Sequence, residues 1–437
     1  MILIYSEKES PRLDYIVHEL LERRLGLSAR ICYNKDEFEV QAKPKINYSS
    51  ISIQGALQII PHGLLHQTDI QKQDIRVTKN TSWHYCFFSK QNELVPFDVF
   101  AASFWLLSRY EEYTADSFDG HRRFSHEYAL AFKNGFIRLP LVDRWAQILG
   151  SLLKELFPEA VISSPTFKFI STIDIDFAYR YKGIGIEKQA GKLIKSVIQG
   201  RFSDILTQLQ TLAGARPDPY DTYRYINKIA NENRLPLMYF FLMRSGTDYD
   251  KNISPYTQEM RSIAKRLSKE FACELHPSYY STQFEKILHE EKQLLEQYTG
   301  KKITRSRQHF LKLSLPQTYE QLSIAGITED YSMGFANHCG FRASTAYPFT
   351  FFNLHSNRQL PLILYPVTIM DTALRYGMKL TPVQAMYEIE TDMNEVEKTG
   401  GVFISIWHNS NLSASEGWES WREVFSKMHT LASIKTK

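Results

Sequence analysis

Two patterns of apolar and polar positions divide the chain. Up to about residue 162, apolar residues recur at helical spacing in three runs, which predict helices over Asp14–Arg24, Asp98–Tyr113 and Pro140–Phe157. The apolar run Met1–Ser6, which charged residues follow directly, predicts an opening β-strand. The segment Phe157–Pro165 then has the character of a junction between two domains.

Beyond this junction the pattern changes to apolar strands followed by helices. The predicted strands are Lys168–Asp174, Pro236–Leu242, Ala272–His276, Ile303–His309, Ser323–Thr328, Leu360–Met370 and Val402–His408. The predicted helices include Tyr220–Asn233, Tyr256–Glu270, Phe284–Gln297 and Pro382–Thr399. This alternation predicts a parallel α/β sheet or a (β/α) barrel.

The length of 437 residues favours two domains, because it exceeds what one hydrophobic core usually supports. We therefore expect an N-terminal α/β domain of unknown function over residues 1–162 and a second domain over residues 163–437. A hydrophobic content of 43% and a charged content of 23% are ordinary for a globular protein.

Charge, cysteine content and hydropathy exclude several classes of protein. The net charge of +4 is small and no block of Lys and Arg occurs, so nucleic-acid binding is not expected. The 4 cysteines are far apart without CxxC spacing, which argues against a zinc ribbon or a disulfide framework. No run of about 18 apolar residues predicts a membrane span, and no signal-peptide pattern opens the chain. We expect a cytoplasmic protein.

Ionisable residues follow the ends of several predicted strands. They are Asp174, Asp176, His276, His309, Asp371 and His408. In (β/α) barrels the active site is built at the carboxyl ends of the strands. These residues are therefore the candidates for chemistry.

Asp174 and Asp176 end the first of these strands two residues apart, so their side chains share one side of it. Two close carboxylates repel unless a cation or a proton relieves them. One of them can then bind a metal while the other acts as a base. The alternative is a capping or turn aspartate after a strand.

His276 stands at a strand end directly before Pro277, which stops the strand and preorganises the imidazole. His276 is a metal-ligand candidate beside the two aspartates, although a lone histidine is more often structural. Arg307 and His309 share a face of another strand. They belong either to a site or to a solubilised edge strand.

Further polar segments also contain candidate residues. Arg342, close to His338, either binds a carboxylate through a bidentate pair or lies on the surface. His408, beside Trp407, can protonate a leaving amine near neutral pH. The polar runs at 109–112 and 119–123 either face the cleft or form ion pairs, and ion pairs are the more common outcome.

With these residues in view, the chain resembles the polysaccharide deacetylases, the NodB-homology carbohydrate esterases. The resemblance covers residues from about 166 to 430. More narrowly, nearly the whole chain resembles a bacterial subgroup that has an extra N-terminal domain of unknown function. The segments that carry it are Thr172–Asp176, His276–Tyr279, Arg307–His309, Gly340–Ala343 and Ile406–Asn409.

The resemblance implies a distorted (β/α) barrel with a divalent metal, often zinc. It implies that Asp174 is the general base, that Asp176 and His276 are metal ligands, that Arg342 orients a catalytic aspartate and that His408 is the general acid. Asp371 is expected to tune His408 or to bind substrate.

The sequence also departs from the family pattern. The second histidine of the metal motif is replaced by Tyr280, so His309 is the predicted third ligand, with His338 as the next candidate. The two motif aspartates are separated by Ile175 rather than adjacent. Arg307, Trp407 and Tyr280 are the predicted substrate-binding residues.

The leading hypothesis is therefore a metal-dependent hydrolase that removes an N-acetyl group from an amino-sugar or polysaccharide substrate. The first alternative is an inactive deacetylase-like barrel that binds carbohydrate or a partner protein. The second is a metal-free glycoside hydrolase that uses Asp174 or Asp176 together with Asp371. Nothing in the sequence indicates an oligomeric state.

Overall fold

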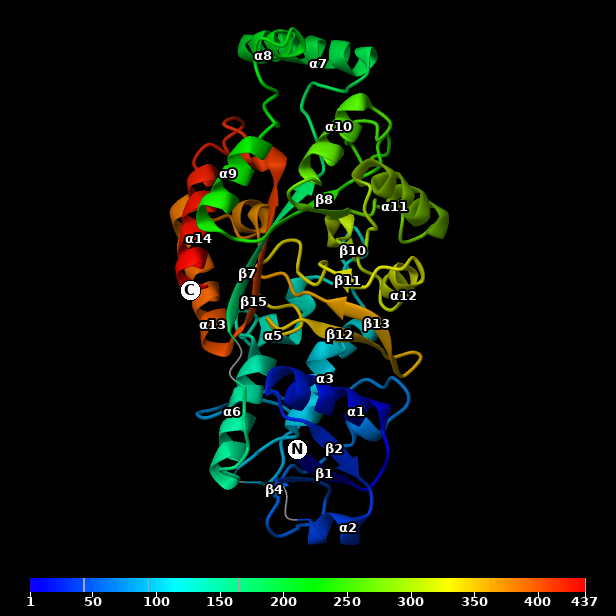
Figure 1. Cartoon of the computed structure of the whole chain (residues 1–437), viewed down its shortest axis with the longest axis vertical. Coiled ribbons are helices and arrows are strands. Elements are labelled where there is room, and N and C mark those ends of the chain that lie inside the picture. The colour runs from blue at the N-terminus through cyan, green and yellow to red at the C-terminus, as the bar shows by residue number, and fades with distance from the viewer. Residues whose placement is uncertain (42–43, 93, 164–165, 437) are drawn as a thin grey trace.

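A computed structural model describes residues 1–41, 44–92, 94–163 and 166–436. Within these residues the chain is a mixed α/β protein with a four-stranded sheet near the N-terminus and a nine-stranded sheet formed by the rest. Figure 1 shows the two sheets at different levels along the long axis. Two residues of the predicted junction, Ser164 and Pro165, lie outside the described part of the chain.

The four-stranded sheet has the order β2-β1-β3-β4, and all of its pairs are parallel. The opening strand predicted over Met1–Ser6 is confirmed, because β1 spans Ile2–Ser6 and is buried throughout. Burial on both faces explains its continuous apolar sequence. The other strands are β2 (Ala29–Cys32), β3 (Lys45–Tyr48) and β4 (Leu57–Gln58), and a separate hairpin joins β5 (Thr78–Asn80) to β6 (His84–Cys86).

The three predicted N-terminal helices are present, two of them with interruptions. The first is α1 (Pro11–Val17), which a π-helical turn extends to Arg24. The second is divided into α3 (Val99–Leu107) and α4 (Tyr110–Tyr113). Arg109 interrupts it with a φ of 55°, a backbone conformation that its two ion pairs with Glu111 and Glu112 help to hold. The third is α6 (Leu141–Leu156), and the shorter helices are α2 (Lys35–Val40) and α5 (Leu130–Lys133).

The nine-stranded sheet has the order β12-β13-β11-β10-β9-β8-β7-β15-β14. Every pair is parallel except β12 with β13. The bounds are β7 (Phe167–Ile175), β8 (Leu237–Phe241), β9 (Ala272–Leu275), β10 (Arg305–Ser306), β11 (Glu329–Asp330), β12 (Phe349–Asn353), β13 (Arg358–Leu364), β14 (Ile369–Met370) and β15 (Gly401–His408). The described strands at the two ends, β12 and β14, do not pair with each other, so the closed barrel stays a prediction.

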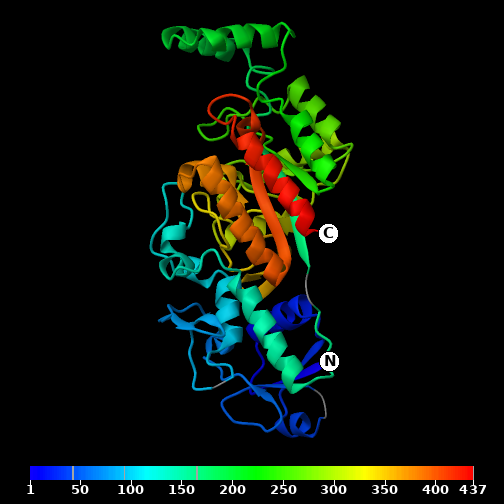
Figure 2. The same ribbon diagram turned by 90° about the vertical axis from the view of Figure 1, so that its left-hand side faces the viewer.

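Helices connect the strands of this sheet and cover it. They are α7 (Ile186–Ile198), α8 (Phe202–Leu212), α9 (Tyr223–Asn233), α10 (Gln258–Leu267), α11 (Glu285–Thr299), α12 (Gln317–Ile324), α13 (Pro382–Thr399) and α14 (Trp421–Lys435). Figure 2 shows α13 and α14 side by side, and α13 packs against β7 and β15. No helix in the described ranges is long and apolar enough to cross a membrane.

Three of the strand predictions need correction. The strand predicted over Leu360–Met370 is two strands, because β13 ends at Leu364 and pairs with β11, whereas β14 starts at Ile369 and pairs with β15. The strand predicted over Ser323–Thr328 is wrong, because α12 ends at Ile324, a turn follows at residues 325–326, and the paired residues come later, in β11. Thr318, Tyr319 and Leu322 are buried at helical spacing, which favours a helix here. The strand predicted over Ile303–His309 is too long, because only Arg305 and Ser306 pair with neighbouring strands.

The N-terminal region packs directly on the nine-stranded sheet. Tyr15 of α1 contacts both Phe104 of α3 and Phe352 of β12 through their rings. Buried residues of both regions form one continuous hydrophobic cluster. The core is therefore shared between the two sheets, and the N-terminal region supports the edge of the larger one.

Candidate metal centre

The predicted chemical residues meet at the carboxyl edge of the nine-stranded sheet. β7 carries Asp174 and leads to Asp176, β9 leads to His276, β10 to His309, and β15 ends at His408. Parallel pairing places these strand ends at the same edge, which is where α/β sheets bind ligands. All five side chains line one cavity of about 340 Å³.

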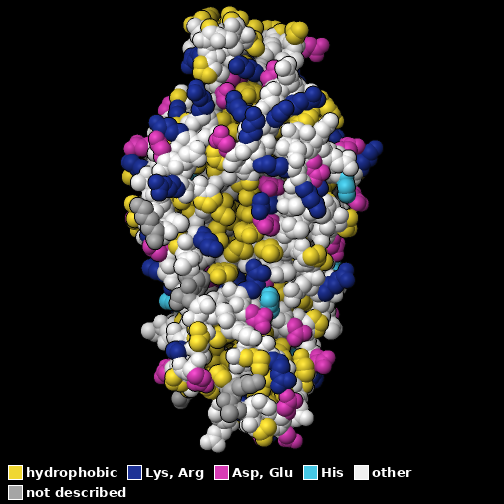
Figure 3. Space-filling view, viewed as in Figure 1, with side chains coloured by type: hydrophobic (Ala, Val, Ile, Leu, Met, Phe, Trp, Pro, Cys, Tyr) yellow, Lys and Arg dark blue, Asp and Glu magenta, His cyan; other side chains and the backbone are white. Residues whose placement is uncertain are grey.

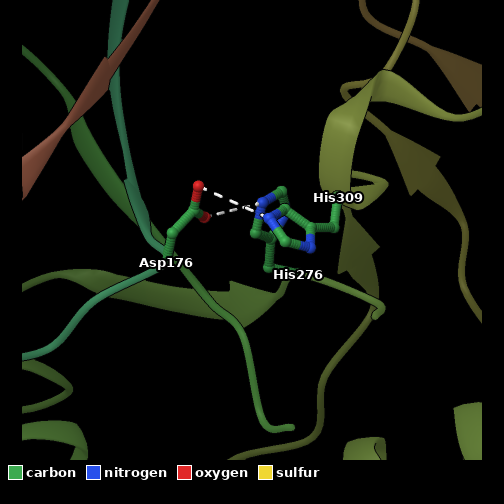
Figure 4. A group of neighbouring side chains, drawn as sticks. All are labelled: Asp176, His276 and His309. Atoms are coloured by element: carbon green, nitrogen blue, oxygen red, sulfur yellow. Dashed lines mark ion pairs between the residues drawn. The ribbon is translucent and has the colours of Figure 1, made fainter. Parts of the chain in front are cut away.

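Asp176 is the centre of this group. Its Oδ1 lies 3.2 Å from Nε2 of His276, and its Oδ2 lies 3.5 Å from Nε2 of His309 and 3.5 Å from Nε2 of His408. Figure 4 shows the carboxylate of Asp176 facing the rings of His276 and His309. Asp176, His276 and His309 each offer one potential ligand atom, and these three atoms lie within 4.8 Å of one another.

The hydrogen bonding of His276 leaves its inner nitrogen available. Nδ1 of His276 contacts the main-chain oxygen of Arg307, which can only accept, so Nδ1 carries the proton in the neutral ring. Nε2 then has no proton, and its lone pair faces Asp176 at 3.2 Å and Asp174 at 3.8 Å. A lone pair against two carboxylates is unfavourable unless a cation or a second proton lies between them.

The donor set fits a divalent metal. Oδ1 of Asp176 is buried without a hydrogen-bond partner in the described part of the chain. Two imidazole nitrogens and one carboxylate oxygen are ligands that zinc accepts, and a three-ligand site leaves a position open. Asp176, His276 and His309 would hold the ion, and His309 would then take the place that Tyr280 leaves empty in the sequence motif.

Asp250 orients His309 from behind. Its Oδ1 accepts a hydrogen bond from Nδ1 of His309 at 2.9 Å, which directs Nε2 toward Asp176. A carboxylate behind a ligating histidine is the usual support of a metal site. Burial alone would lower the pKa of His309, but Asp176 and Asp250 raise it to about 9. Burial alone would raise the pKa of Asp176, but His309 and His408 hold it well below the ordinary carboxyl value.

His408 has a carboxylate partner of its own. Oδ1 of Asp371 accepts from Nδ1 of His408 at 2.8 Å, and Oδ2 accepts from its main-chain N–H at 2.9 Å. Burial opposes protonation, yet Asp371 and Asp176 raise the pKa of His408 to about 10. The contact expected between Asp371 and His408 is therefore present. Asp371 itself is fully buried and does not line the cavity.

Arg307, and not Arg342, contacts Asp174. Nη1 of Arg307 donates to Oδ1 of Asp174 at 2.7 Å and to Oγ1 of Thr172 at 2.7 Å. Arg307 is fully buried, so it holds Asp174 and is not a substrate-binding side chain. The predicted orienting role of Arg342 is wrong in position, because its guanidinium pairs with Glu112 of the N-terminal region.

Three other predicted residues lie away from the cavity. Trp407 is fully buried on β15 and packs edge-on against Phe425, so its predicted contact with substrate is wrong. Tyr280 lies beside Tyr249 and does not line the cavity. His338 stacks on His126 at 4.8 Å between ring centres and does not reach Asp176.

The N-terminal region contributes side chains that the sequence did not assign firmly. His121 and Arg123 line the cavity together with the residues from the strand ends. Nδ1 of His121 lies 3.1 Å from the hydroxyl of Tyr279, and Nη1 of Arg123 donates to the main-chain oxygen of Phe310 at 2.6 Å. Of the two polar runs there, 119–123 faces the cleft, whereas 109–112 forms buried ion pairs.

Comparisons with known proteins cover different parts of the chain. Residues 2–158 match a family of unknown function (DUF7033). No curated protein matches the sequence significantly.

Among solved structures, a protein described as a polysaccharide deacetylase from Mycobacterium smegmatis aligns with a TM-score of 0.39 and 14% identity, covering 62% of this chain and 86% of that one. Puue allantoinase aligns with a TM-score of 0.38 and 11% identity over 62% and 84% of the two chains. A polysaccharide deacetylase from Bacillus cereus aligns with a TM-score of 0.29 and 11% identity over 61% and 87%.

Proposed function

We propose that this chain is a metal-dependent hydrolase that removes an N-acyl group, such as acetyl, from an amino-sugar or polysaccharide substrate. The observation that carries the proposal is the convergence of one carboxylate, Asp176, with the Nε2 atoms of three histidines inside one cavity. The sequence motifs that resemble polysaccharide deacetylases supply these same residues.

Asp176, His276 and His309 would hold the ion, for which zinc is the first candidate. When bound, such an ion supplies Lewis-acid polarisation of an acyl carbonyl and makes water more acidic. The residues around it then bind the substrate and move protons.

Asp174 is suited to accept a proton from water. Its Oδ1 is occupied by Arg307 and its Oδ2 faces Nε2 of His276, so Oδ2 is the atom directed into the site. His408 is suited to donate a proton from Nε2 to the departing amine nitrogen, because Nδ1 is hydrogen-bonded to Asp371 and Nε2 is the nitrogen left for the substrate. His121 and Arg123, which also line the cavity, would bind polar groups of the sugar.

The geometry disfavours a metal-free glycoside hydrolase. That chemistry requires two carboxyl groups that both face the scissile bond. Asp371 is buried behind His408 and lies outside the cavity lining, so it cannot partner Asp174 or Asp176 across a sugar.

Acetate release from N-acetylated oligosaccharides tests the proposal. Protein purified without a His tag should contain roughly one zinc per chain. The Asp176→Ala and His276→Ala variants should lose it, whereas Asp174→Asn and His408→Ala should keep the metal and lose acetate release. His289→Ala, on α11 and away from the cavity, is the matched control and should behave as the wild type.

The results separate the competing hypotheses. Stoichiometric metal without any acetate release from the wild type would indicate an inactive binding protein. Acetate release that survives both Asp174→Asn and His408→Ala would exclude the proposed proton transfers. Metal binding that survives Asp176→Ala and His276→Ala would exclude the proposed ligands.

A further inference from the structure

A helical hairpin projects from the end of the molecule farthest from the N-terminal sheet. It consists of α7 and α8, which are joined at Gly200. Both ribbon views show it standing off the rest of the chain on its two connecting segments (Figures 1 and 2). It is inserted between β7, which carries Asp174 and leads to Asp176, and α9.

The hairpin exposes a large set of apolar side chains. Eight of them have exposed fractions between 48% and 88%. They are Ile186, Ile194, Val197, Ile198, Phe202, Leu206, Leu209 and Leu212. Figure 3 shows hydrophobic side chains gathered along this end of the molecule. A contiguous apolar patch of this kind marks an interaction site in a folded protein.

The opposite side of the hairpin is polar and basic. A cavity of about 1200 Å³ separates the hairpin from the body, and Lys188, Lys192, Lys195 and Arg201 line it. Of the eight exposed apolar residues only Ile186 belongs to this lining. The hairpin is therefore amphipathic, with its apolar side turned away from the body and its basic side turned toward it.

The charge of the hairpin favours an anionic partner. Between residues 186 and 212 there are four basic residues and only two acidic ones, Glu187 and Asp204. The hairpin therefore carries a net charge of +2, from four basic and two acidic residues, and an anionic lipid surface attracts it. Amphipathic helices with lysines on the polar face lie in the plane of a membrane interface, and lysine stems extend to reach the headgroups.

We propose that the α7–α8 hairpin docks this chain peripherally onto an anionic lipid surface. The apolar side chains enter the boundary between headgroups and acyl chains, and Lys188 and Lys195 contact lipid phosphates. The proposal does not depend on the activity of the metal centre. In the chain, residues 176–185 connect β7 to the hairpin.

Sedimentation with lipid vesicles tests the docking. Vesicles of phosphatidylglycerol and phosphatidylcholine in equal parts should bind the full chain, and vesicles of phosphatidylcholine alone should bind it more weakly. The triple variant Ile194→Ser/Ile198→Ser/Phe202→Ser should reduce partitioning by about a hundredfold, because three large apolar groups no longer leave water. The Lys188→Gln/Lys195→Gln variant should reduce it by about thirtyfold on the anionic vesicles only.

A control on α13 distinguishes this surface from exposed apolar residues in general. Val383 and Tyr387 are 82% and 68% exposed, so Val383→Ser/Tyr387→Ser removes comparable groups elsewhere and should leave binding unchanged. All of these positions are exposed, and an unchanged circular dichroism spectrum confirms folding.

Three results would overturn the proposal. The first is a wild type that does not sediment with anionic vesicles. The second is a triple variant that binds vesicles as the wild type does. The third is a wild-type dimer in gel filtration that the triple variant converts to a monomer without any vesicle binding, which would make this surface an interface between copies.

Discussion

Substitutions behind His309 and His408 separate the metal ligand from the proton donor. Both histidines place Nε2 at 3.5 Å from Oδ2 of Asp176, and both have an aspartate behind Nδ1. The partner is Asp250 for His309, at 2.9 Å, and Asp371 for His408, at 2.8 Å. If His309 is the ligand, Asp250→Asn should weaken metal binding and Asp371→Asn should not.

The surroundings of Asp250 set the expected magnitude. Oδ1 accepts from Nδ1 of His309 and from the main-chain N–H of Tyr279, and Oδ2 meets the hydroxyl of Thr247. Asparagine can keep both contacts of Oδ1, including the one to His309, but it loses the contact to Thr247, whose hydroxyl oxygen already accepts from the main-chain N–H groups of residues 249 and 250. Loss of the supporting carboxylate costs about tenfold to a hundredfold in metal affinity, and we expect the lower end, about 1.4 kcal/mol.

Asp371 differs, because both of its oxygens meet donors. Oδ1 accepts from Nδ1 of His408 and the N–H of Thr372, and Oδ2 accepts from the N–H of His408 and from Asn411. An amide nitrogen in either position faces a donor, so Asp371→Asn should cost about 1–3 kcal/mol of stability. It should also lower kcat without changing the zinc affinity.

Competition for zinc against a chromophoric chelator gives the affinity of each variant, and urea unfolding gives its stability. A loss of zinc affinity in Asp371→Asn but not in Asp250→Asn would exchange the roles of the two histidines. Equal zinc affinity in both variants and the wild type would show that neither histidine binds the metal.

Three further predictions concern buried groups. Burial lowers the pKa of His429 from its ordinary 6.5 to about 4, so this histidine takes up a proton in the unfolded chain before it does in the folded one. About 3 kcal/mol of stability that is present above pH 6.5 should therefore be lost as the pH falls to 4. Urea unfolding of His429→Gln should lack this part of the pH dependence. Glu112→Gln should reduce stability in urea by about 3–5 kcal/mol, because it leaves the buried Arg342 without its carboxylate. Arg307→Lys should lower kcat by about a hundredfold with KM and zinc content nearly unchanged, as measured by steady-state kinetics.

The predictions for Glu112 and Arg307 each have a matched control. Asp116→Asn breaks an ion pair in which both side chains are at least 80% exposed, and should change stability by less than about 0.5 kcal/mol. Arg342→Lys should reduce stability without lowering kcat of the folded enzyme, and the opposite result would restore Arg342 as the residue that orients Asp174. An unchanged pH dependence in His429→Gln would contradict the assignment to that histidine.

Local sequence pattern was sufficient where one strand determines the outcome. Alternation along β7 brought Asp174 and Asp176 to one side, and both line the cavity. His276 could be recognised because Pro277 ends its strand. For His309 the expected position at a strand end was nearly correct, although the strand is short and the histidine opens a helical turn.

Contacts between distant segments could not be predicted in this way. Arg307 follows a short strand and Arg342 lies in a loop, and the sequence around them does not indicate which one contacts Asp174. Only the packed structure shows that it is Arg307. Asp250 lies in a loop without a motif, and its role depends on the fold bringing it to His309. The α7–α8 hairpin has helical apolar spacing, but sequence alone gives no measure of its exposure.

The buried contacts between the N-terminal region and the large sheet have a practical consequence for dissecting the chain. Asp143 of α6 accepts from the main-chain N–H of Ala346 at 2.7 Å and from the hydroxyl of Thr345 at 2.6 Å. A fragment that starts near residue 163 would lack this acceptor and would uncover apolar residues of β12. Such a fragment should be recovered as an aggregate, so expression trials on the large sheet need to include residues 1–162.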